Sequence, residues 1–494
     1  MPLHHSPFLS ARSSILFFAF ASLSPVFCAE PAPGNSPVLD LGSRRELFVD
    51  SYLIDQMKNT RLSLHHPRDE GSVLKFDKPW EGRFCIYSTV IKDGGKYQLF
   101  YRGMPTTGHV KGNEVTCYAE SQDGIHWVKP ELGLYESHGS KKNNIILAFH
   151  RACHNLSPFL DRNPRAKKSE RYKALGGSGK PGLIAFSSSD GIHWTEMQKA
   201  PVLTKGAFDS QNVSFWSEME RQYLSYFRVF SGGIRRISRS TSKDFIHWSE
   251  PVMMEYRHHG GRAPIEHLYT NQTQPYFRAP HLYISTAARF MPGRQVLSEE
   301  QARAIHVDPG YFKDTSDSIF QSTRGGGFYE RTFLSSFIPP GIGASNWVSR
   351  TNYPALNVVQ TGPTEMSVYV NADYAQPTSH LERYAMRLDG FASVRGDYAG
   401  GELVTKPLRF SGTQLEINFS TSAAGGIRVE IQNQQGEAIH DFSLKDSREQ
   451  IGNEIARVVS WKGGSDVSSL AGKVVRLRFV LKDADLFALR FLKD

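Results

Sequence analysis

Ser121-Gln-Asp-Gly-Ile-His-Trp127 is the first of three copies of one phrase in this sequence. The other two are Ser188-Ser-Asp-Gly-Ile-His-Trp194 and Ser242-Lys-Asp-Phe-Ile-His-Trp248. A phrase that recurs after roughly 40–50 residues plus loops is typical of the four-stranded blade of a β-propeller. The residues between the copies form short runs in which apolar and polar residues alternate, as they do in strands. The sequence therefore predicts a repeated four-stranded sheet.

The phrase itself predicts a turn between two strands. Asp-Gly suits a tight turn, and the aromatic residue that follows is expected to pack between neighbouring sheets. Carboxylate oxygens at this position can accept hydrogen bonds from the amides of the turn. We therefore expect Asp123, Asp190 and Asp244 to stabilise the scaffold and not to take part in catalysis.

Two weaker copies raise the number of predicted blades to five. They are Ser322-Thr-Arg-Gly-Gly-Gly-Phe328 and Arg387-Leu-Asp-Gly-Phe391. In each unit the first strand is expected to line a central channel. These innermost strands are predicted at residues 84–91, 156–160, 212–216, 272–277 and 355–360.

The sequence changes character near Tyr398-Ala-Gly-Gly401. The residues that follow keep the alternation of apolar and polar side chains but carry no repeat phrase, a pattern that favours a β-sandwich. A chain of 494 residues is too long for one core. We predict an all-β protein with a five-bladed β-propeller over residues 30–398, followed by a β-sandwich over residues 399–494.

The first residues are typical of a signal peptide. Arg12 precedes the apolar run 15–21, and a cleavage site is expected before Ala29 or Glu30. A lipid anchor on Cys28 is the alternative. The apolar run is too short to span a bilayer. We expect residues 1–29 to be a signal peptide, the protein to be secreted or periplasmic, and no stable insertion into a membrane.

Three cysteines follow the predicted cleavage site: Cys85, Cys117 and Cys153. An odd and sparse set argues against a disulfide framework, and the spacing is not that of metal ligands. We expect these thiols to pack in the core. The sequence predicts no cofactor and no metal ligand, and leaves open a structural calcium ion in the channel.

The chain carries a formal net charge of +9, and many of its arginines lie in the first four predicted blades. Guanidinium groups bind carboxylates and sulfates in a bidentate manner, which favours an anionic sugar chain as the partner. The alternative is a set of surface arginines without a ligand. The arginines of the first four predicted blades are Arg83, Arg102, Arg151, Arg228, Arg235, Arg236, Arg239, Arg257, Arg262, Arg289 and Arg294.

No nucleic-acid binding motif is present, and we expect no nucleic-acid partner.

The segments that lead into the innermost strands are expected to meet at one mouth of the channel. Three carboxylates lie in these segments: Glu81, Asp209 and Glu266. Hydrolysis of a glycosidic bond takes one acid that protonates the leaving oxygen and one carboxylate that acts as nucleophile or base. We predict these residues, with His154 as a further general acid, to be catalytic. The alternatives are ion pairs with arginines such as Arg83 or Arg262, and a histidine buried in the core.

Other polar and aromatic residues of the same segments are predicted to bind substrate. They are Trp80, Arg83, Asn155, Asn212, Tyr269, Asn271 and Arg350.

The repeat phrase, the five units, the acids ahead of the innermost strands and the trailing sandwich together resemble the five-bladed propeller glycoside hydrolases of the invertase and arabinanase kind. The segments Glu46-Leu-Phe-Val-Asp-Ser-Tyr-Leu-Ile54 and Phe208-Asp-Ser-Gln-Asn-Val-Ser-Phe-Trp216 are similar to an exported branch related to those enzymes. The resemblance implies hydrolysis of a poly- or oligosaccharide.

That family places an acid in each of its first three blades. Glu81 stands where those enzymes usually carry aspartate, and Asp209 matches the position in the third blade. The second blade departs from the family, because it presents His154 and Asn155 in place of an acid. A related exo-acting group that cleaves anhydrogalactose uses a histidine as acid, and by that analogy His154 takes this part.

Two alternatives remain open at this point. One is a carbohydrate-binding propeller without catalysis, in which Trp80, Tyr269 and Trp347 hold a sugar. The other is a sialidase, which also uses such Asp-Gly turns. A sialidase needs three arginines on one carboxylate and a tyrosine nucleophile with a glutamate partner, for which Tyr269 and Glu266 are the candidates.

Overall fold

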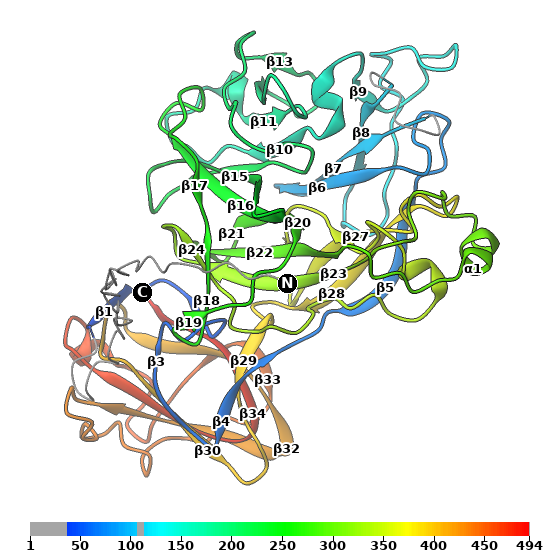
Figure 1. Ribbon diagram of the computed structural model, residues 1–494. Coiled ribbons are helices and arrows are strands. Elements are labelled where there is room, and N and C mark those ends of the chain that lie inside the picture. The colour runs from blue at the N-terminus through cyan, green and yellow to red at the C-terminus, as the bar shows by residue number, and fades with distance from the viewer. Residues whose placement is uncertain (1–36, 106–112, 494) are drawn as a thin grey trace, which may run out of the picture. The chain divides into compact units, whose positions relative to one another are not determined.

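The computed structural model describes residues 37–105 and 113–493, and within them the protein is all-β (Figure 1). The predicted signal peptide of residues 1–29 lies outside the described residues, and export stays a prediction. Among the described residues the only α-helix is α1 (Glu299–Ala304). A serine at its N-cap position, Ser298, accepts a hydrogen bond from the Gln301 amide.

Three consecutive sheets contain four antiparallel strands each, in the order in which the strands follow along the chain. This is the arrangement that the repeat phrase predicts. The first sheet contains β6 (Ile86–Asp93), β7 (Lys96–Gly103), β8 (Val115–Ser121) and β9 (Ile145–Leu147). The second contains β10 (Ser157–Leu160), β11 (Tyr172–Gly176), β12 (Ile184–Ser188) and β13 (Thr195–Glu196), and the third β14 (Val213–Ser217), β15 (Gln222–Ser231), β16 (Ile234–Ser242) and β17 (Val252–Met253).

Two larger sheets continue this succession. One contains β21 (Thr273–Tyr276), β22 (Ala279–Met291), β23 (Thr315–Thr323) and β24 (Phe328–Glu330), with the flanking β18 (Glu255–His258), β19 (Gly261–Arg262) and β20 (Leu268–Thr270). The other contains β25 (Tyr353–Pro354), β26 (Val359–Gln360), β27 (Glu365–Ala372), β28 (His380–Arg387) and the early strand β5 (Arg68–Lys75). The arrangement is propeller-like. The innermost strands β6, β10, β14, β21 and β26 fall within or next to the predicted ranges.

The repeat phrase forms the predicted turn in all three clear copies. Asp123 Oδ1 accepts hydrogen bonds from the amides of Ile125 and His126, both at 2.8 Å. Asp190 and Asp244 bind the corresponding amides at 2.8–2.9 Å. The scaffold role of these three carboxylates is confirmed.

The weaker copy at 387–391 differs from the other three. Asp389 is buried and pairs with Arg45 at 3.3 Å and with Arg278 at 3.0 Å. It also accepts a hydrogen bond from the hydroxyl of Tyr276. Its carboxylate therefore joins three segments of the chain and does not bind the amides of its own turn.

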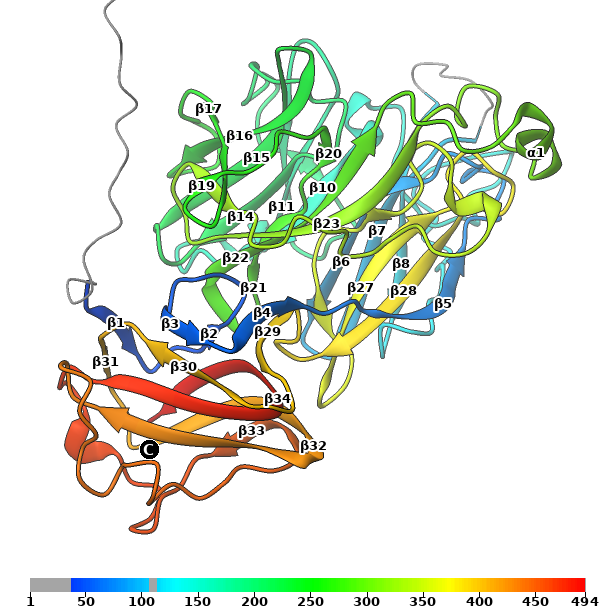
Figure 2. The same ribbon diagram turned by 60° about the horizontal axis from the view of Figure 1, so that its bottom comes forward.

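The strands at the two ends of the described chain share one sheet (Figure 2). β2 (Glu46–Leu47) pairs with β34 (Arg476–Leu492), β3 (Ile54–Lys58) with β30 (Gly401–Thr405), and β4 (Thr60–Leu64) with β29 (Ala392–Gly396). β32 (Gln414–Gln432) and β33 (Asn453–Val458) complete this sheet, and β1 (Leu39–Gly42) pairs with β31 (Leu408–Phe410).

The early strands β2, β3 and β4 and the strand β29 lie within the predicted propeller range of residues 30–398 and pair with one another or with C-terminal strands. The physical reason for this pairing is the burial of apolar side chains. Leu41, Phe48 and Leu53 pack in one core with Val394 and with residues of the C-terminal strands such as Phe479. The early strands carry no repeat phrase that would have revealed this.

A buried charge cluster joins β2 to the sheet that contains β23. Glu46 is fully buried and pairs with Arg324 at 2.7 Å and with His281 at 2.9 Å. Arg324 also contacts Asp50 at 3.2 Å. Burial opposes the ionisation of Glu46, but Arg324 and His281 outweigh it and lower the pKa of this carboxyl to about 2.

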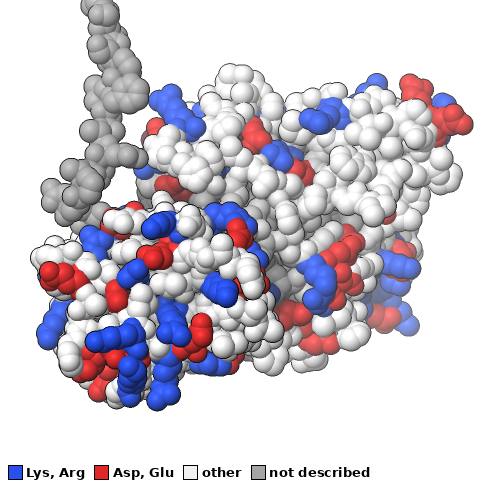
Figure 3. All heavy atoms as spheres, turned by 90° about the horizontal axis from the view of Figure 1, so that it is seen from below, with Lys and Arg blue, Asp and Glu red and all other residues white. Residues whose placement is uncertain are grey.

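No helix among the described residues is long and apolar enough to cross a membrane. Basic and acidic side chains are interspersed on the face of the molecule that Figure 3 shows. The C-terminal strands carry ion pairs of this kind, for example Arg478 with Glu402 at 3.0 Å. Surface pairs of this type contribute little to stability.

We predict that Glu46→Gln lowers the free energy of unfolding by about 3 kcal/mol at pH 7, because it breaks a buried ion pair. The pKa of Glu46 is lower in the folded protein than its ordinary value of 4.5, so its stabilising effect is complete above about pH 5 and is lost as the pH falls toward 2. Urea unfolding of both proteins between pH 7 and pH 3 measures this. Glu255→Gln, at an exposed position of β18, is the control. If the difference in the free energy of unfolding between wild type and Glu46→Gln does not shrink as the pH falls, the ionised Glu46 does not stabilise the fold in this way.

Candidate functional site

His154 and Asp209 meet at the end of the sheets where the innermost strands begin, here called the strand-start end. His154 closes the short helix Arg151–His154, which precedes β10, and Asp209 precedes β14. His154 Nε2 lies 2.9 Å from Asp209 Oδ1. The segments ahead of β10 and β14 meet, as predicted, and bring His154 and Asp209 into contact.

A second carboxylate holds the other side of the same imidazole. Glu114 Oε1 lies 3.2 Å from His154 Nδ1, and Arg102 Nη1 lies 3.4 Å from that nitrogen. Arg102 is itself fixed, because its Nη2 donates to the Phe84 carbonyl and to the Tyr374 hydroxyl. His154 is therefore oriented between Glu114 and Asp209.

Both carboxylates remain ionised at neutral pH. The hydrogen bond with His154 lowers the pKa of Glu114 to about 2. The hydrogen bond with His154 also holds the pKa of Asp209 well below its usual range, and the charges of Arg228 and Arg102 add to this effect. Asp209 and Glu114 are thus suited to act as bases or nucleophiles and not as proton donors. The imidazole of His154 is the group of the three that can donate a proton through an N–H group.

Several residues at or ahead of the starts of strands β6, β21 and β25 have a left-handed backbone. Tyr87 has φ +60°, Gln272 φ +41° and Arg350 φ +60°. A residue with a side chain seldom adopts this conformation, which costs on the order of 1 kcal/mol or more and is concentrated at functional sites. Tyr87 lies against the pair, since its ring is 5.0 Å from the guanidinium of Arg102 and 5.8 Å from the ring of His154.

Three arginines surround the ring of Tyr269 at the same end. The guanidinium carbons of Arg228, Arg235 and Arg350 lie 4.7, 5.3 and 5.6 Å from the centre of this ring. The Arg228 side chain is only 4% exposed, and its Nη2 lies 3.9 Å from Asp209 Oδ2. Among the described residues, its Nε and Nη1 have no hydrogen-bond partner. The cluster therefore adjoins the His154–Asp209 pair and carries donors that the protein does not satisfy.

The structure does not bring Glu81 to this site. Its side chain is fully buried and binds the Tyr101 hydroxyl at 2.5 Å, Lys129 Nζ at 2.7 Å and the Lys78 amide at 2.8 Å. A carboxylate with three internal partners and no exposed surface does not reach a substrate. The arrangement indicates a scaffold role in place of the predicted catalytic one.

Glu266 forms ion pairs with arginines. An ion pair is the alternative to catalysis that the sequence left open, but with Arg83 or Arg262 as the partners. Its Oε1 pairs with Arg289 at 2.9 Å and its Oε2 with Arg331 at 2.8 Å. These two charges lower the pKa of Glu266 against the opposing effect of its burial. Both oxygens are occupied, so the structure gives Glu266 no role as an acid, and it does not form the pair with Tyr269 that a sialidase would need.

The predicted asparagines fix the backbone of the site. Asn155 Nδ2 donates to the carbonyls of Phe208 and Ser210, both at 2.7 Å, so that it holds the segment that carries Asp209. Asn212 donates to the same two carbonyls. Asn271 accepts a hydrogen bond from the Thr273 amide. All three are buried, so they position the site and do not face a ligand.

The remaining predicted residues lie on loops. Trp80 Nε1 donates to Asn144 at 2.7 Å, and Arg83 Nη1 lies 3.5 Å from the His306 carbonyl. Neither contacts His154 or Asp209 in the described structure. Glu114 was missed as a site residue, because it lies ahead of β8 and not in a segment that leads into an innermost strand. Arg102, on β7, was predicted only as one of the arginines that favour an anionic partner.

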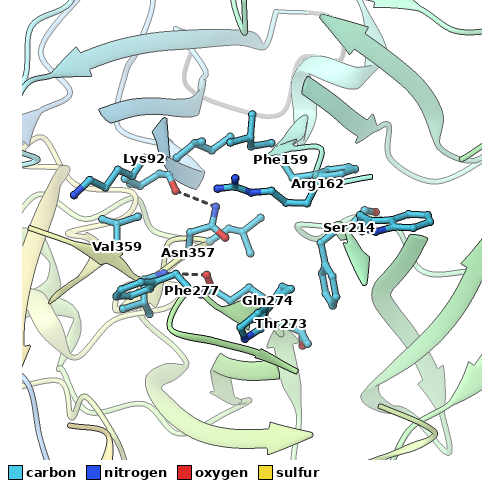
Figure 4. Close-up of a pocket in the computed structure, with 18 of the residues that line it drawn as sticks. Lys92, Phe159, Arg162, Ser214, Thr273, Gln274, Phe277, Asn357 and Val359 are labelled. Atoms are coloured by element: carbon cyan, nitrogen blue, oxygen red, sulfur yellow. Dashed lines mark hydrogen bonds between the residues drawn. The ribbon is translucent and has the colours of Figure 1, made fainter. Parts of the chain in front are cut away.

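A cavity of about 490 Å³ lies where the innermost strands end (Figure 4). Phe159, Trp216 and Phe277 line it together with Arg162 and Asn357. None of the predicted site residues lines this cavity. Gln211 and Gln272 precede the cavity-lining residues of β14 and β21, and their side chains are joined by a hydrogen bond of 2.6 Å.

Across residues 37–105 and 113–493, no group of three or more histidine, cysteine, aspartate or glutamate side chains is placed to hold a metal ion. The three predicted free cysteines, Cys85, Cys117 and Cys153, are buried and unpaired, as expected. The structural calcium ion that the sequence left open stays untested.

No protein-family model and no curated protein matches the sequence. Among solved structures, an N-acetylgalactosamine deacetylase from F. plautii, in complex with blood group B trisaccharide, is similar with a TM-score of 0.45 and 12% identity, over 67% of this chain and 97% of that one. A GH32 beta-fructofuranosidase from Bombyx mori has a TM-score of 0.42 and 10% identity, over 85% and 94% of the two chains. An alpha-L-arabinofuranosidase from Fusarium graminearum has a TM-score of 0.38 and 12% identity, over 65% and 99%. Because these TM-scores lie below 0.5, the function is inferred from the residues of this chain.

We predict that Glu81→Gln lowers the free energy of unfolding by about 3 kcal/mol, because Lys129 then loses its buried carboxylate partner and keeps only the exposed Asp77, at 3.2 Å. Catalysis per folded molecule is expected to stay unchanged. Chemical denaturation and a specific-activity assay on the folded fraction measure the two effects separately. Glu131→Gln, at an exposed position, is the matched control. If Glu81→Gln keeps the stability of the wild type but loses activity, Glu81 is a catalytic residue.

Proposed function

We propose that this protein is a glycoside hydrolase that acts on a poly- or oligosaccharide at the strand-start end. The observation that carries the proposal is the contact of 2.9 Å between His154 Nε2 and Asp209 Oδ1. It joins a proton carrier to an ionised and accessible carboxylate. Hydrolysis of a glycosidic bond needs these two kinds of group.

Asp209 acts as the nucleophile or base. Its side chain is 60% exposed, which is unusual for a carboxylate beside two buried arginines, and its lowered pKa keeps it charged. The carboxylate either attacks the anomeric carbon or removes a proton from the water that attacks it. In both cases the oxygen added to the sugar comes from water, and the bond between the anomeric carbon and the leaving oxygen breaks.

His154 acts as the general acid, in place of a second carboxylate. In the free protein His154 and Asp209 satisfy each other. A glycosidic oxygen that takes the place of Asp209 at Nε2 receives the proton as the bond breaks. The proton released by the attacking water restores the imidazole, directly or by way of Asp209. Glu114 and Arg102 hold the ring in position from the Nδ1 side. The predicted mechanism with two or three carboxylates is thereby replaced by one carboxylate and one histidine.

The finer architecture that we propose is a five-bladed propeller. Its blades are the five successive sheets whose innermost strands are β6, β10, β14, β21 and β26, and β5 supplies the outer strand of the last one. We further propose that the sheet of β29–β34 with β2–β4 is a sandwich that covers one flank of the propeller, since its core is continuous with early apolar residues such as Phe48.

The substrate that we propose is anionic, carrying sulfate or uronic acid groups, because arginines gather beside Asp209. Export to the periplasm or the medium is proposed from the sequence of residues 1–29 and agrees with a polymeric substrate. The main alternative is a carbohydrate-binding propeller without catalysis. Binding of a sugar alone does not require an ionised aspartate in contact with a histidine. The contact between Asp209 and His154 therefore favours a hydrolase over a binding protein.

We predict that Asp209→Asn and His154→Gln each lower kcat/KM by about 100- to 10,000-fold, the range typical of the loss of a general acid or base. Release of reducing ends from sulfated, uronic and neutral glycans measures this effect. Glu218→Gln, on the rim of the cavity at the other end of the strands, is the control and should retain wild-type activity. Circular dichroism shows whether each variant is folded.

Activity of folded Asp209→Asn near the wild-type level would contradict the proposal. A wild type that binds one of these glycans without cleaving it would establish the binding propeller instead.

A further inference from the structure

We propose that Arg228, Arg235 and Arg350 bind one anionic group, a carboxylate or a sulfate, on the sugar unit whose glycosidic bond is broken. That the ligand is a sugar rests on the proposed function. The arginine site itself is inferred from the contacts of these side chains and can be tested without any catalysis.

Separate parts of the fold bring the three arginines together. Arg228 lies on β15 and Arg235 on β16, and Phe230 of β15 pairs directly with Arg235. Side chains two residues apart on a strand share a face, so Arg228, Phe230 and Arg235 project from the same face of this hairpin. Tyr269 comes from β20, and Arg350 from the loop that precedes β25. Three sheets therefore supply the parts of one cluster.

The position of Arg350 is maintained against backbone strain. Its φ of +60° is unfavourable for a residue with a β-carbon, and Asn352 nearby has φ +63°. The guanidinium lies 4.8 Å from the ring of Tyr311 and 5.6 Å from that of Tyr269. A strained backbone that aims a charged side chain at two other arginines is the pattern expected of a ligand site.

The charge of the cluster is not balanced within the protein. Guanidinium groups stay protonated, so three positive charges surround one aromatic ring. Among the described residues, Nε of each of the three arginines has no hydrogen-bond partner, and neither has Nη1 of Arg228. Arg228 is 4% exposed, and its acidic neighbour Asp209 lies 3.9 Å away with one oxygen already used by His154. Buried charges and donors without partners are strongly unfavourable, and the ring of Tyr269 compensates them only in part.

A bound anion would complete the cluster. Carboxylate and sulfate both offer oxygens that match the paired N–H groups of a guanidinium. Because Arg228 contacts both Tyr269 and Asp209, an anion on these arginines lies within the span of one sugar ring from the proposed nucleophile or base. The anionic group therefore belongs to the sugar unit at the reacting centre and not to a distant part of the chain.

The first test measures binding to the full-length protein by isothermal titration calorimetry, with sodium sulfate and sodium glucuronate as the probes. We expect wild type and Asp209→Asn to bind at least one of them, and Arg228→Met to bind it at least 10-fold more weakly. Arg228→Lys, which keeps the charge but loses the paired donors, should also bind more weakly. Arg162→Met, which removes an arginine from the cavity at the other end of the strands, is the matched control.

The second test compares kcat/KM for sulfated oligosaccharides with that for their desulfated forms, and for uronic oligosaccharides with that for their carboxyl-reduced forms. Wild type should prefer the charged member of one pair by at least 10-fold, and Arg228→Met and Arg350→Met should lose most of this preference through KM. The pair that responds shows whether the anion is a sulfate ester or a carboxylate.

The outcomes separate the two proposals. Absence of binding of both probes to wild type, or equal binding by folded Arg228→Met, would overturn the arginine site even where hydrolysis is found. Binding that depends on Arg228 in a protein that cleaves none of the glycans would support the arginine site and overturn the proposed hydrolase. If the arginine variants fail to fold, Arg235→Gln at the more exposed position of the cluster takes their place.

Discussion

The pairing of β5 with β28 ties the beginning of the described chain to the last of the successive sheets. It joins residues 68–75 to residues 380–387 in antiparallel register, so that an early strand completes the last of the successive sheets. The first and last sheets then lie side by side, as the parallel bridge between Thr89 and Leu356 and the hydrogen bond from the Ala375 amide to the Arg83 carbonyl show. Without this pairing the innermost strands would not begin around a common point.

The site follows from that convergence. Segments from several sheets end together at the strand-start end, and each contributes one part: His154 from the second sheet, Asp209 from the third and Tyr269 from the fourth. The buried amides of Asn155 and Asn212 fix the backbone between Phe208 and Ser210, so the position of Asp209 does not depend on a flexible loop. A rigid support of this kind is what precise catalytic geometry requires.

Electrostatics give the two ends of the innermost strands different properties. At the strand-start end, His154 and the arginines keep Asp209 and Glu114 ionised, and donors of Arg228 remain available for a ligand. At the other end, the cavity is lined by Phe159, Phe215 and Trp216, with charges such as Arg162 among them. The proposed reacting groups are therefore concentrated at one end, although the cavity of about 490 Å³ lies at the other.

The sequence was sufficient to predict much of the fold, because a repeated turn leaves a repeated signature. The Asp-Gly turns and the alternating runs locate most strands of the first four sheets. The strands of residues 39–64 could not be assigned in the same way, because they carry no phrase and pair with residues several hundred positions away. Pairing over such a distance leaves no local pattern in the sequence.

The position of a residue ahead of an innermost strand predicted part of the site. It did not predict which way the side chain points. Glu81 and Asp209 both precede innermost strands, yet Asp209 is 60% exposed beside His154 whereas Glu81 is buried against Lys129. Glu266 meets arginines of its own sheet on β22 and in the loop after β24. Glu114 was missed because it approaches the imidazole from the start of β8. These differences depend on which way a side chain points and on its packing neighbours, and neither is encoded in a short motif.

A crystal structure of Asp209→Asn with a glycan that the wild type cleaves would show whether a saccharide binds for cleavage at His154 and Asp209. We expect a glycosidic oxygen within hydrogen-bond distance of His154 Nε2 and the anomeric carbon facing the side chain at position 209. A saccharide bound only in the cavity between Phe159, Trp216 and Phe277, with the strand-start end empty, would contradict the proposed hydrolysis at this site.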